Sequence, residues 1–153
     1  MIRLDISHLS WQLNKSFKIS RGSKNTAETI EVKLTDDKFI GIGECVPYGR
    51  YDETLESVEK EILELKDGIE NLEINKKNLD QFINNGAARN AIDCALWDLE
   101  SKKKKESVWS MLDIQKPQEI PSSYTVVLDD PDKMIEDIYQ HREFPSIKIK
   151  VEN

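Results

Sequence analysis

Apolar side chains recur at every second position in three stretches near the amino terminus, which is the period of a β-strand. These stretches are residues 2–13, residues 30–34 and residues 39–44. A change of phase within the first stretch indicates a bulge or bend, and the polar residues 36–38 supply a turn that predicts a hairpin of the other two. Gly41 and Gly43 leave one face of the last strand thin, which suits close approach of another backbone or of a ligand. Residues 17–25 lack this pattern and predict a mobile loop.

Spacings of three and four between apolar residues predict helices in the middle of the chain. The first is predicted to begin at the N-cap Asp52 and to end at Gly68. A weaker helical pattern covers residues 75–83, and a strong one, rich in alanine, covers residues 87–99 and favours close helix packing. Another short helix is predicted at residues 108–112. We interpret the four lysines at 102–105 as a solvated helix end, where cations suit the helix dipole.

The pattern changes after Pro117. Residues 120–128 are rich in β-forming side chains, Asp130 and Pro131 are a typical helix start, and a last strand follows at residues 147–151. Two strands joined through one helix predict a parallel pair with a right-handed crossover. One helix cannot cover both faces of such a pair, so this portion is expected to be incomplete by itself.

The last strand carries the candidate chemistry. Alternation places Lys148 and Lys150 on one face and turns Ile147, Ile149 and Val151 toward apolar packing. Repulsion between two ammonium groups, with any burial, lowers a lysine pKa toward a value that suits a base at neutral pH. The same pattern describes an edge strand whose lysines face water and discourage aggregation, so the strand alone leaves both interpretations open.

Composition narrows the class of protein. The chain has 153 residues, enough for one domain or for one domain and part of another, and its net charge of −7 argues against nucleic acid or an anionic membrane as partner. No apolar run reaches the ~20 residues of a membrane span, and the first residues lack a signal-peptide layout, so we predict a cytoplasmic protein. Cys45 and Cys94 form no CxxC motif, so neither zinc nor a disulfide is expected, and Cys94 is predicted in the core.

Five short motifs occur in a fixed order. They are Ile19-Ser20-Arg21-Gly22, residues 41–47 with 50–54 after them, residues 91–99, Ser123-Tyr124-Thr125-Val126, and Lys148-Ile149-Lys150. Together they resemble the amino-terminal part of the enolase superfamily, muconate-lactonizing subgroup, and within it the dipeptide epimerases of the L-Ala-D/L-Glu type. The resemblance implies an α+β capping domain over residues 1–116, with an antiparallel three-stranded sheet and a helical bundle. It implies the first βαβ unit of a truncated (β/α) TIM-type barrel over residues 117–153.

The resemblance also implies roles for individual residues. In such enzymes a lysine removes the proton α to a substrate carboxylate, and Mg²⁺ stabilises the enediolate. Lys150 takes the position of this base, and Lys148 lies beside it, lowers its pKa and contacts the carboxylate. Thr125 matches a residue that lines the substrate pocket. Arg21 is the candidate for recognition of the substrate's side chain, for example an acidic group, and Tyr51 for lining the same lid.

Other parts of the family's site belong to later strands, namely three Mg²⁺ carboxylates and a second lysine. We therefore expect no metal ligands and no activity in this chain by itself, with a dipeptide substrate bound only when a complementing barrel chain is present. Asp98 and Glu100 are predicted to have surface or structural roles. A second hypothesis is a non-catalytic product of a shortened or split gene that self-associates through its exposed strands. Muconate cycloisomerase and o-succinylbenzoate synthase share the Lys-x-Lys motif and stay open as alternatives.

Overall fold

The computed structural model describes residues 2–19 and 22–151, which form two compact units. The first unit contains the chain up to Trp11 together with Glu28–Lys116, and the second contains Gln12–Ala27 together with the chain from Pro117 onward. The predicted domains 1–116 and 117–153 stay a prediction, because units defined by contacts need not be the units in which the chain folds. Among the described residues, none of the helices has both the length and the apolar character that crossing a membrane requires.

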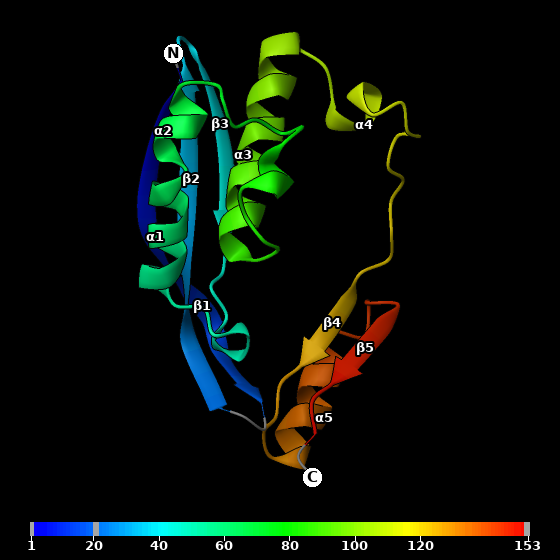
Figure 1. The fold of residues 1–153 in the computed structure, drawn as a ribbon. Coiled ribbons are helices and arrows are strands. Elements are labelled where there is room, and N and C mark those ends of the chain that lie inside the picture. Colours follow the sequence, from blue (N-terminus) through cyan, green and yellow to red (C-terminus); the bar gives the residue numbers. More distant parts are fainter. Residues whose placement is uncertain (1, 20–21, 152–153) are drawn as a thin grey trace. The chain divides into compact units, whose positions relative to one another are not determined.

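The amino-terminal sheet contains β1 (Arg3–Ile19), β2 (Gly22–Asp36) and β3 (Phe39–Cys45) in the order β1-β2-β3 (Figure 1). β2 and β3 pair antiparallel from Ile30 opposite Cys45 to Asp36 opposite Phe39, which confirms the predicted hairpin. The prediction of a loop over residues 17–25 is wrong, because β1 continues to Ile19 and β2 already begins at Gly22. Residues 14–18 and 22–25 are exposed, so these strand ends lack the apolar alternation on which the prediction depended.

Four helices and two 3₁₀ turns follow within the first unit. They are η1 (Gly49–Tyr51), α1 (Leu55–Glu64), α2 (Lys66–Glu70), η2 (Leu79–Gln81), α3 (Ala87–Lys104) and α4 (Val108–Met111). The cap of α1 is Thr54, which accepts a hydrogen bond from the Ser57 amide at 3.1 Å, whereas the predicted cap Asp52 ends η1 in the left-handed conformation. The predicted stop Gly68 lies inside α2, and the weak pattern at 75–83 forms only the turn η2.

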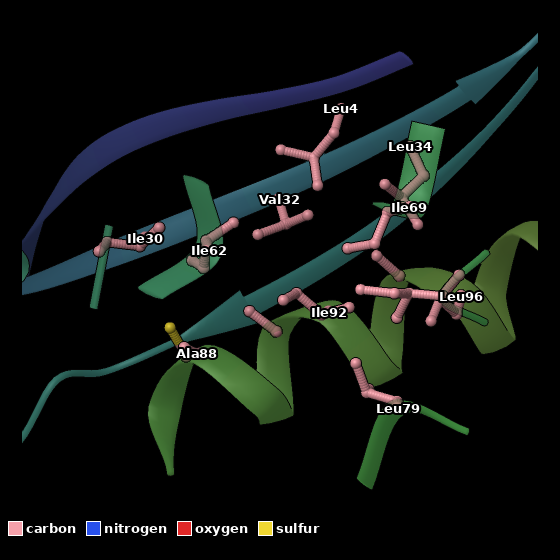
Figure 2. Packing of buried hydrophobic residues seen from close by; sticks show 14 of the residues in the cluster. Leu4, Ile30, Val32, Leu34, Ile62, Ile69, Leu79, Ala88, Ile92 and Leu96 are labelled. Atoms are coloured by element: carbon pink, nitrogen blue, oxygen red, sulfur yellow. The ribbon is translucent and has the colours of Figure 1, made fainter. Parts of the chain in front are cut away.

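A single hydrophobic core joins one face of this sheet to α1, α2 and α3 (Figure 2). The largest fully buried side chains of this unit are Ile30, Val32, Leu34, Val58, Ile62, Ile69 and Ile92. Cys94 was predicted in this core and is exposed, because α3 already buries Ala91, Ala95 and Leu99 on the face turned to the sheet.

The backbone of α3 packs directly against the face of β3 on which Gly41 and Gly43 lack side chains. A Cβ atom built on Gly43 would lie 2.7 Å from the Ala95 amide nitrogen and still closer to the Ala91 carbonyl oxygen. A Cβ atom on Gly41 would lie 2.5 Å from Leu99 Cβ. The predicted close approach of another backbone is therefore confirmed, and the partner is the alanine-rich helix.

In the second unit, β4 (Ser123–Val126) and β5 (Ser146–Ile149) are parallel neighbours joined through α5 (Pro131–Gln140), as predicted. The predicted cap of α5 is confirmed, since the Asp130 carboxylate accepts a hydrogen bond from the Asp132 amide at 3.0 Å and Pro131 occupies the first turn. The apolar packing predicted for the last strand is wrong at Ile149 and Val151, which are 49% and 69% exposed. In the described part of the chain, α5 is the one helix joining the two strands, which leaves these side chains uncovered.

Candidate functional site

The parallel pair β4-β5 has two faces of different chemistry. Tyr124 lies on the face covered by α5, because its hydroxyl donates to the Asp137 carboxylate at 3.0 Å, and Val126 follows on the same face. Residues of the other parity point to the opposite face. The strand register pairs Thr125 with Lys148. Two residues earlier on each strand, Ser123 and Ser146 are also paired, and their side chains are hydrogen-bonded to each other.

Lys150 extends this second face beyond the end of β5. Its amide donates to the Val126 carbonyl at 3.0 Å, so the ladder continues past Ile149 and Lys150 has the same parity as Lys148. Thr125, Lys148 and Lys150 therefore share the face turned away from α5. Thr125 and Lys150 are half-buried, and Lys148 is exposed.

The chemistry of this face suits an anion. Two ammonium groups two residues apart on a strand are separated by roughly 7 Å along the strand axis, so a carboxylate can contact one while its α-carbon approaches the other. The Thr125 hydroxyl adds a group that both donates and accepts hydrogen bonds. Three of the five predicted site residues are thus brought together.

The other two predicted residues are not brought into this group. Arg21 lies outside the described residues. Tyr51 belongs to η1 in the first unit, where the residue is 70% exposed and its ring packs edge-on against Tyr48 with 5.8 Å between ring centres. Its role in lining a lid stays a prediction.

Sequence reasoning missed a polar cluster on the covered face of β4. The Lys15 ammonium forms an ion pair with the Asp137 carboxylate at 2.7 Å and donates to the Tyr124 hydroxyl. The His141 ring stacks on Tyr124 with 3.8 Å between ring centres, and its Nδ1 lies 2.9 Å from the Asp137 carbonyl oxygen. These contacts fasten β1 to the βαβ segment within the second unit. More than 100 residues separate Lys15 from its partners, so no local pattern could have indicated the cluster.

The electrostatics of this cluster favour its charged form. Burial opposes ionisation of Asp137, but hydrogen bonds from Lys15 and Tyr124 outweigh it, so the pKa of the carboxyl lies below its ordinary value. Burial likewise opposes the charge on Lys15, and the hydrogen bonds to Asp137 and Tyr124 again prevail, so the pKa of the ammonium lies above its ordinary value. The attachment is therefore ionic at neutral pH.

Comparison with known proteins places the chain in a family. Residues 1–113 match the family model described as "Mandelate racemase / muconate lactonizing enzyme, N-terminal domain". The chain belongs to this family. Its antiparallel sheet with helices and the parallel pair that follows agree with the amino-terminal part of enolase-superfamily structures, which confirms the predicted capping domain and βαβ unit.

Several relatives are epimerases or racemases. The chain is 37% identical over 125 residues to the L-Ala-D/L-Glu epimerase of Escherichia coli (strain K12), a match that covers 82% of this chain and 39% of the relative. An enolase family member from Agrobacterium tumefaciens with homology to dipeptide epimerases, solved with sodium and L-Ala-L-Glu, is 36% identical with a TM-score of 0.93; the match covers 99% of this chain and 46% of that one.

The dipeptide epimerase of Cytophaga hutchinsonii, solved with Mg and D-Ala-L-Val, is 27% identical with a TM-score of 0.84, and the match covers 99% of this chain and 44% of that one. This chain therefore spans less than half the length of these relatives.

Magnesium in relatives of this family raises the question of ligands here. Within residues 2–19 and 22–151 there is no group of three or more His, Cys, Asp or Glu side chains that could hold a metal ion. Asp98 pairs with Lys102 at 2.6 Å, and Glu100 pairs with Lys76 and Lys104 at 2.7 Å each. The described residues therefore do not fit Mg²⁺. These ion pairs also show that Lys102 and Lys104, of the four lysines at the end of α3, are bound to neighbouring carboxylates. The interpretation of these lysines as a solvated helix end did not include such pairs.

Proposed function

We propose that this chain is the amino-terminal part of a dipeptide epimerase acting on dipeptides of the Ala-Glu type. The observation that carries the proposal is the shared position of Thr125, Lys148 and Lys150 on the face of β4-β5 turned away from α5. In a barrel of parallel strands with helices outside, that face lines the interior, and active sites lie at the carboxyl ends of the strands. Lys150 follows the carboxyl end of β5.

Each residue of this face has a proposed role. Lys150, as a neutral amine, accepts the proton from the carbon α to the substrate carboxylate, and the electron pair left on carbon delocalises into that carboxylate. The Lys148 ammonium contacts the carboxylate, and the Thr125 hydroxyl hydrogen-bonds within the pocket. Arg21 and Tyr51 are proposed to contact the remainder of the dipeptide.

The proposed reaction needs more of a barrel than the described residues supply. Relatives solved with Mg support a magnesium requirement for the complete enzyme, but no step through the metal is assigned to residues of this chain. We propose that the further barrel strands come from additional polypeptide, either in the same chain or in a complementing one.

Exchange of the substrate α-proton with solvent tests the proposal. The chain would be fused in frame to the remaining barrel of the E. coli relative and incubated with L-Ala-L-Glu in deuterium oxide, and loss of the α-proton signal would be followed by NMR. Removing a general base typically costs about 10²–10⁴-fold in rate, so Lys150→Ala is expected to reduce exchange by at least about 100-fold. Lys133→Ala is the matched control, since Lys133 is an exposed lysine on α5 paired with Asp129.

Two results would contradict this assignment. Exchange retained in Lys150→Ala would remove Lys150 from the role of base. No exchange in the unsubstituted fusion, with turnover of muconate or of an o-succinylbenzoate precursor instead, would move the chain to a cycloisomerase or synthase. Lys150→Arg separates charge from proton acceptance, because a guanidinium keeps the charge and cannot act as a base at neutral pH.

A further inference from the structure

The strand β3 lies at an edge of the three-stranded sheet. Edge strands expose backbone N–H and C=O groups to which a strand of another chain can pair. Ile40 and Ile42, on the outer face of β3, are 44% and 42% exposed, so an added strand could also bury apolar side chains there. An unprotected strand of this kind is expected to promote association.

Side chains of α3 occupy three of the backbone groups of this edge. The Ile42 amide donates to Asp98 Oδ2 at 2.8 Å, and the Lys102 ammonium donates to the Ile40 carbonyl at 2.8 Å. The Glu44 carbonyl accepts a hydrogen bond from the Asn90 side-chain amide at 3.1 Å. Residues 40, 42 and 44 alternate along β3, so their peptide groups point to the same edge.

The sequence of α3 makes this arrangement possible. Asn90, Asp98 and Lys102 are separated by multiples of four residues, so they follow one stripe of the helix. Gly41 and Gly43 allow the backbone of α3 to lie directly along β3, which Figure 1 shows, and this brings the stripe within hydrogen-bond reach of the edge. The Asp98–Lys102 ion pair at 2.6 Å holds both side chains in place.

We propose that Asn90, Asp98 and Lys102 close the β3 edge against strand addition by a second copy of this chain. A second copy is the natural competitor because β3 can pair antiparallel with its own symmetry mate, and both copies then present the same residues across a two-fold axis. The three α3 side chains take the places of three of the donors and acceptors that this strand would offer. The inference does not depend on the proposed catalytic function.

Amide hydrogen exchange tests the closure directly. Asp98→Ala is expected to accelerate exchange of the Ile42 amide at least about tenfold, the effect of losing one hydrogen bond to a charged acceptor. Asp98→Asn keeps an acceptor oxygen and is expected to stay close to the unsubstituted chain. Lys104→Ala is the matched control, because the Lys104–Glu100 pair has the same spacing on α3 and lies outside the stripe of Asn90, Asp98 and Lys102.

Amides of β2 serve as an internal reference. If Asp98→Ala accelerates exchange at Val32 and Leu34 as much as at Ile42, the side chain contributes only general stability and the proposal is overturned. Equal exchange of the Ile42 amide in Asp98→Ala and the unsubstituted chain would also overturn it.

Self-association tests the consequence. Sedimentation over a range of concentrations is expected to show a dimer fraction in the double variant Asp98→Ala/Lys102→Ala that is larger than in Lys104→Ala or the unsubstituted chain. Adding Ile42→Lys to the double variant is expected to remove the increase, because like charges then meet across the paired strands. A double variant that associates no more than Lys104→Ala would refute closure.

Discussion

Replacing Gly43 by alanine probes the contact on which the arrangement of the first unit depends. The new methyl group would lie 2.7 Å from the Ala95 amide nitrogen and 3.0 Å from the Ala91 carbonyl carbon, whereas ordinary van der Waals contact begins at 3.4 Å. Relieving the contact with the Ala95 nitrogen alone requires a movement of 3.4 minus 2.7, or 0.7 Å, and the helix backbone must move further than this because the Ala91 carbonyl oxygen lies closer still. Such a movement disturbs every buried side chain of α3.

The cost follows from overpacking in a dense core. Inserting one methyl group into a well-packed site costs typically about 1–3 kcal/mol, and a clash with helix backbone relaxes less easily than one with a flexible side chain. We expect Gly43→Ala to lower the free energy of unfolding by about 3 kcal/mol. Because the clashing atoms are backbone atoms, adding Ala91→Gly is not expected to restore stability.

Urea unfolding followed by circular dichroism measures this change. Gly49→Ala is the matched control, since a Cβ atom at Gly49 would meet nothing within 4 Å, and we expect it to stay within about 0.5 kcal/mol of the unsubstituted chain. Equal stability of Gly43→Ala and Gly49→Ala would refute the inference that β3 and α3 are held in backbone contact.

Two further predictions concern ionisable groups. Burial, together with the nearby Glu53 carboxylate, raises the pKa of the Cys45 thiol to about 11. A thiol reagent at neutral pH should therefore modify the exposed Cys94 in the folded chain and reach the buried Cys45 only after unfolding. Rapid modification of both thiols would contradict the fold. The Asp137 carboxyl has a folded pKa below its unfolded value of about 4, so its pairing with Lys15 stabilises the chain above that pH, and this contribution is lost as the pH falls through the folded pKa. Urea unfolding should therefore show Lys15→Met less stable than the unsubstituted chain by roughly 1 kcal/mol at pH 7, and this difference should shrink as the pH falls below about 4. A difference that does not shrink in acid would argue against the ion pair.

Features governed by local periodicity could be predicted from the sequence. The alternation of Ile30, Val32 and Leu34 predicted β2, and the glycines of β3 predicted the close approach of a backbone. The Asp130-Pro131 start predicted α5 and with it the parallel pair. In each case the decisive residues lie within a few positions of one another, so the pattern is visible without the fold.

Features that depend on distant partners could not be predicted. The last residues of β1 and the first of β2 are exposed and lack an apolar stripe. Within the second unit, β1 is held to the βαβ segment by Lys15 and by the hydrogen bond from the Leu128 amide to the Lys18 carbonyl. The N-cap of α1 was placed two residues early, because Asp52 and Thr54 are both good caps and only the reciprocal bonds with Ser57 decide between them.

The last strand shows the limit of periodicity most clearly for the candidate site. Alternation predicts that Lys148 and Lys150 share a face, but it could not predict that this face lies opposite α5 or how buried it is, because both depend on which elements cover each face. Lys148 is exposed, and an exposed ammonium is hydrated and screened by salt, so its attraction for a carboxylate is weak. The proposed recognition of a substrate carboxylate therefore requires that other parts of a barrel cover this face. For this reason the exchange experiment uses a fusion that completes the barrel and encloses the face carrying Lys148 and Lys150, and an isolated βαβ unit would not test the role of Lys150.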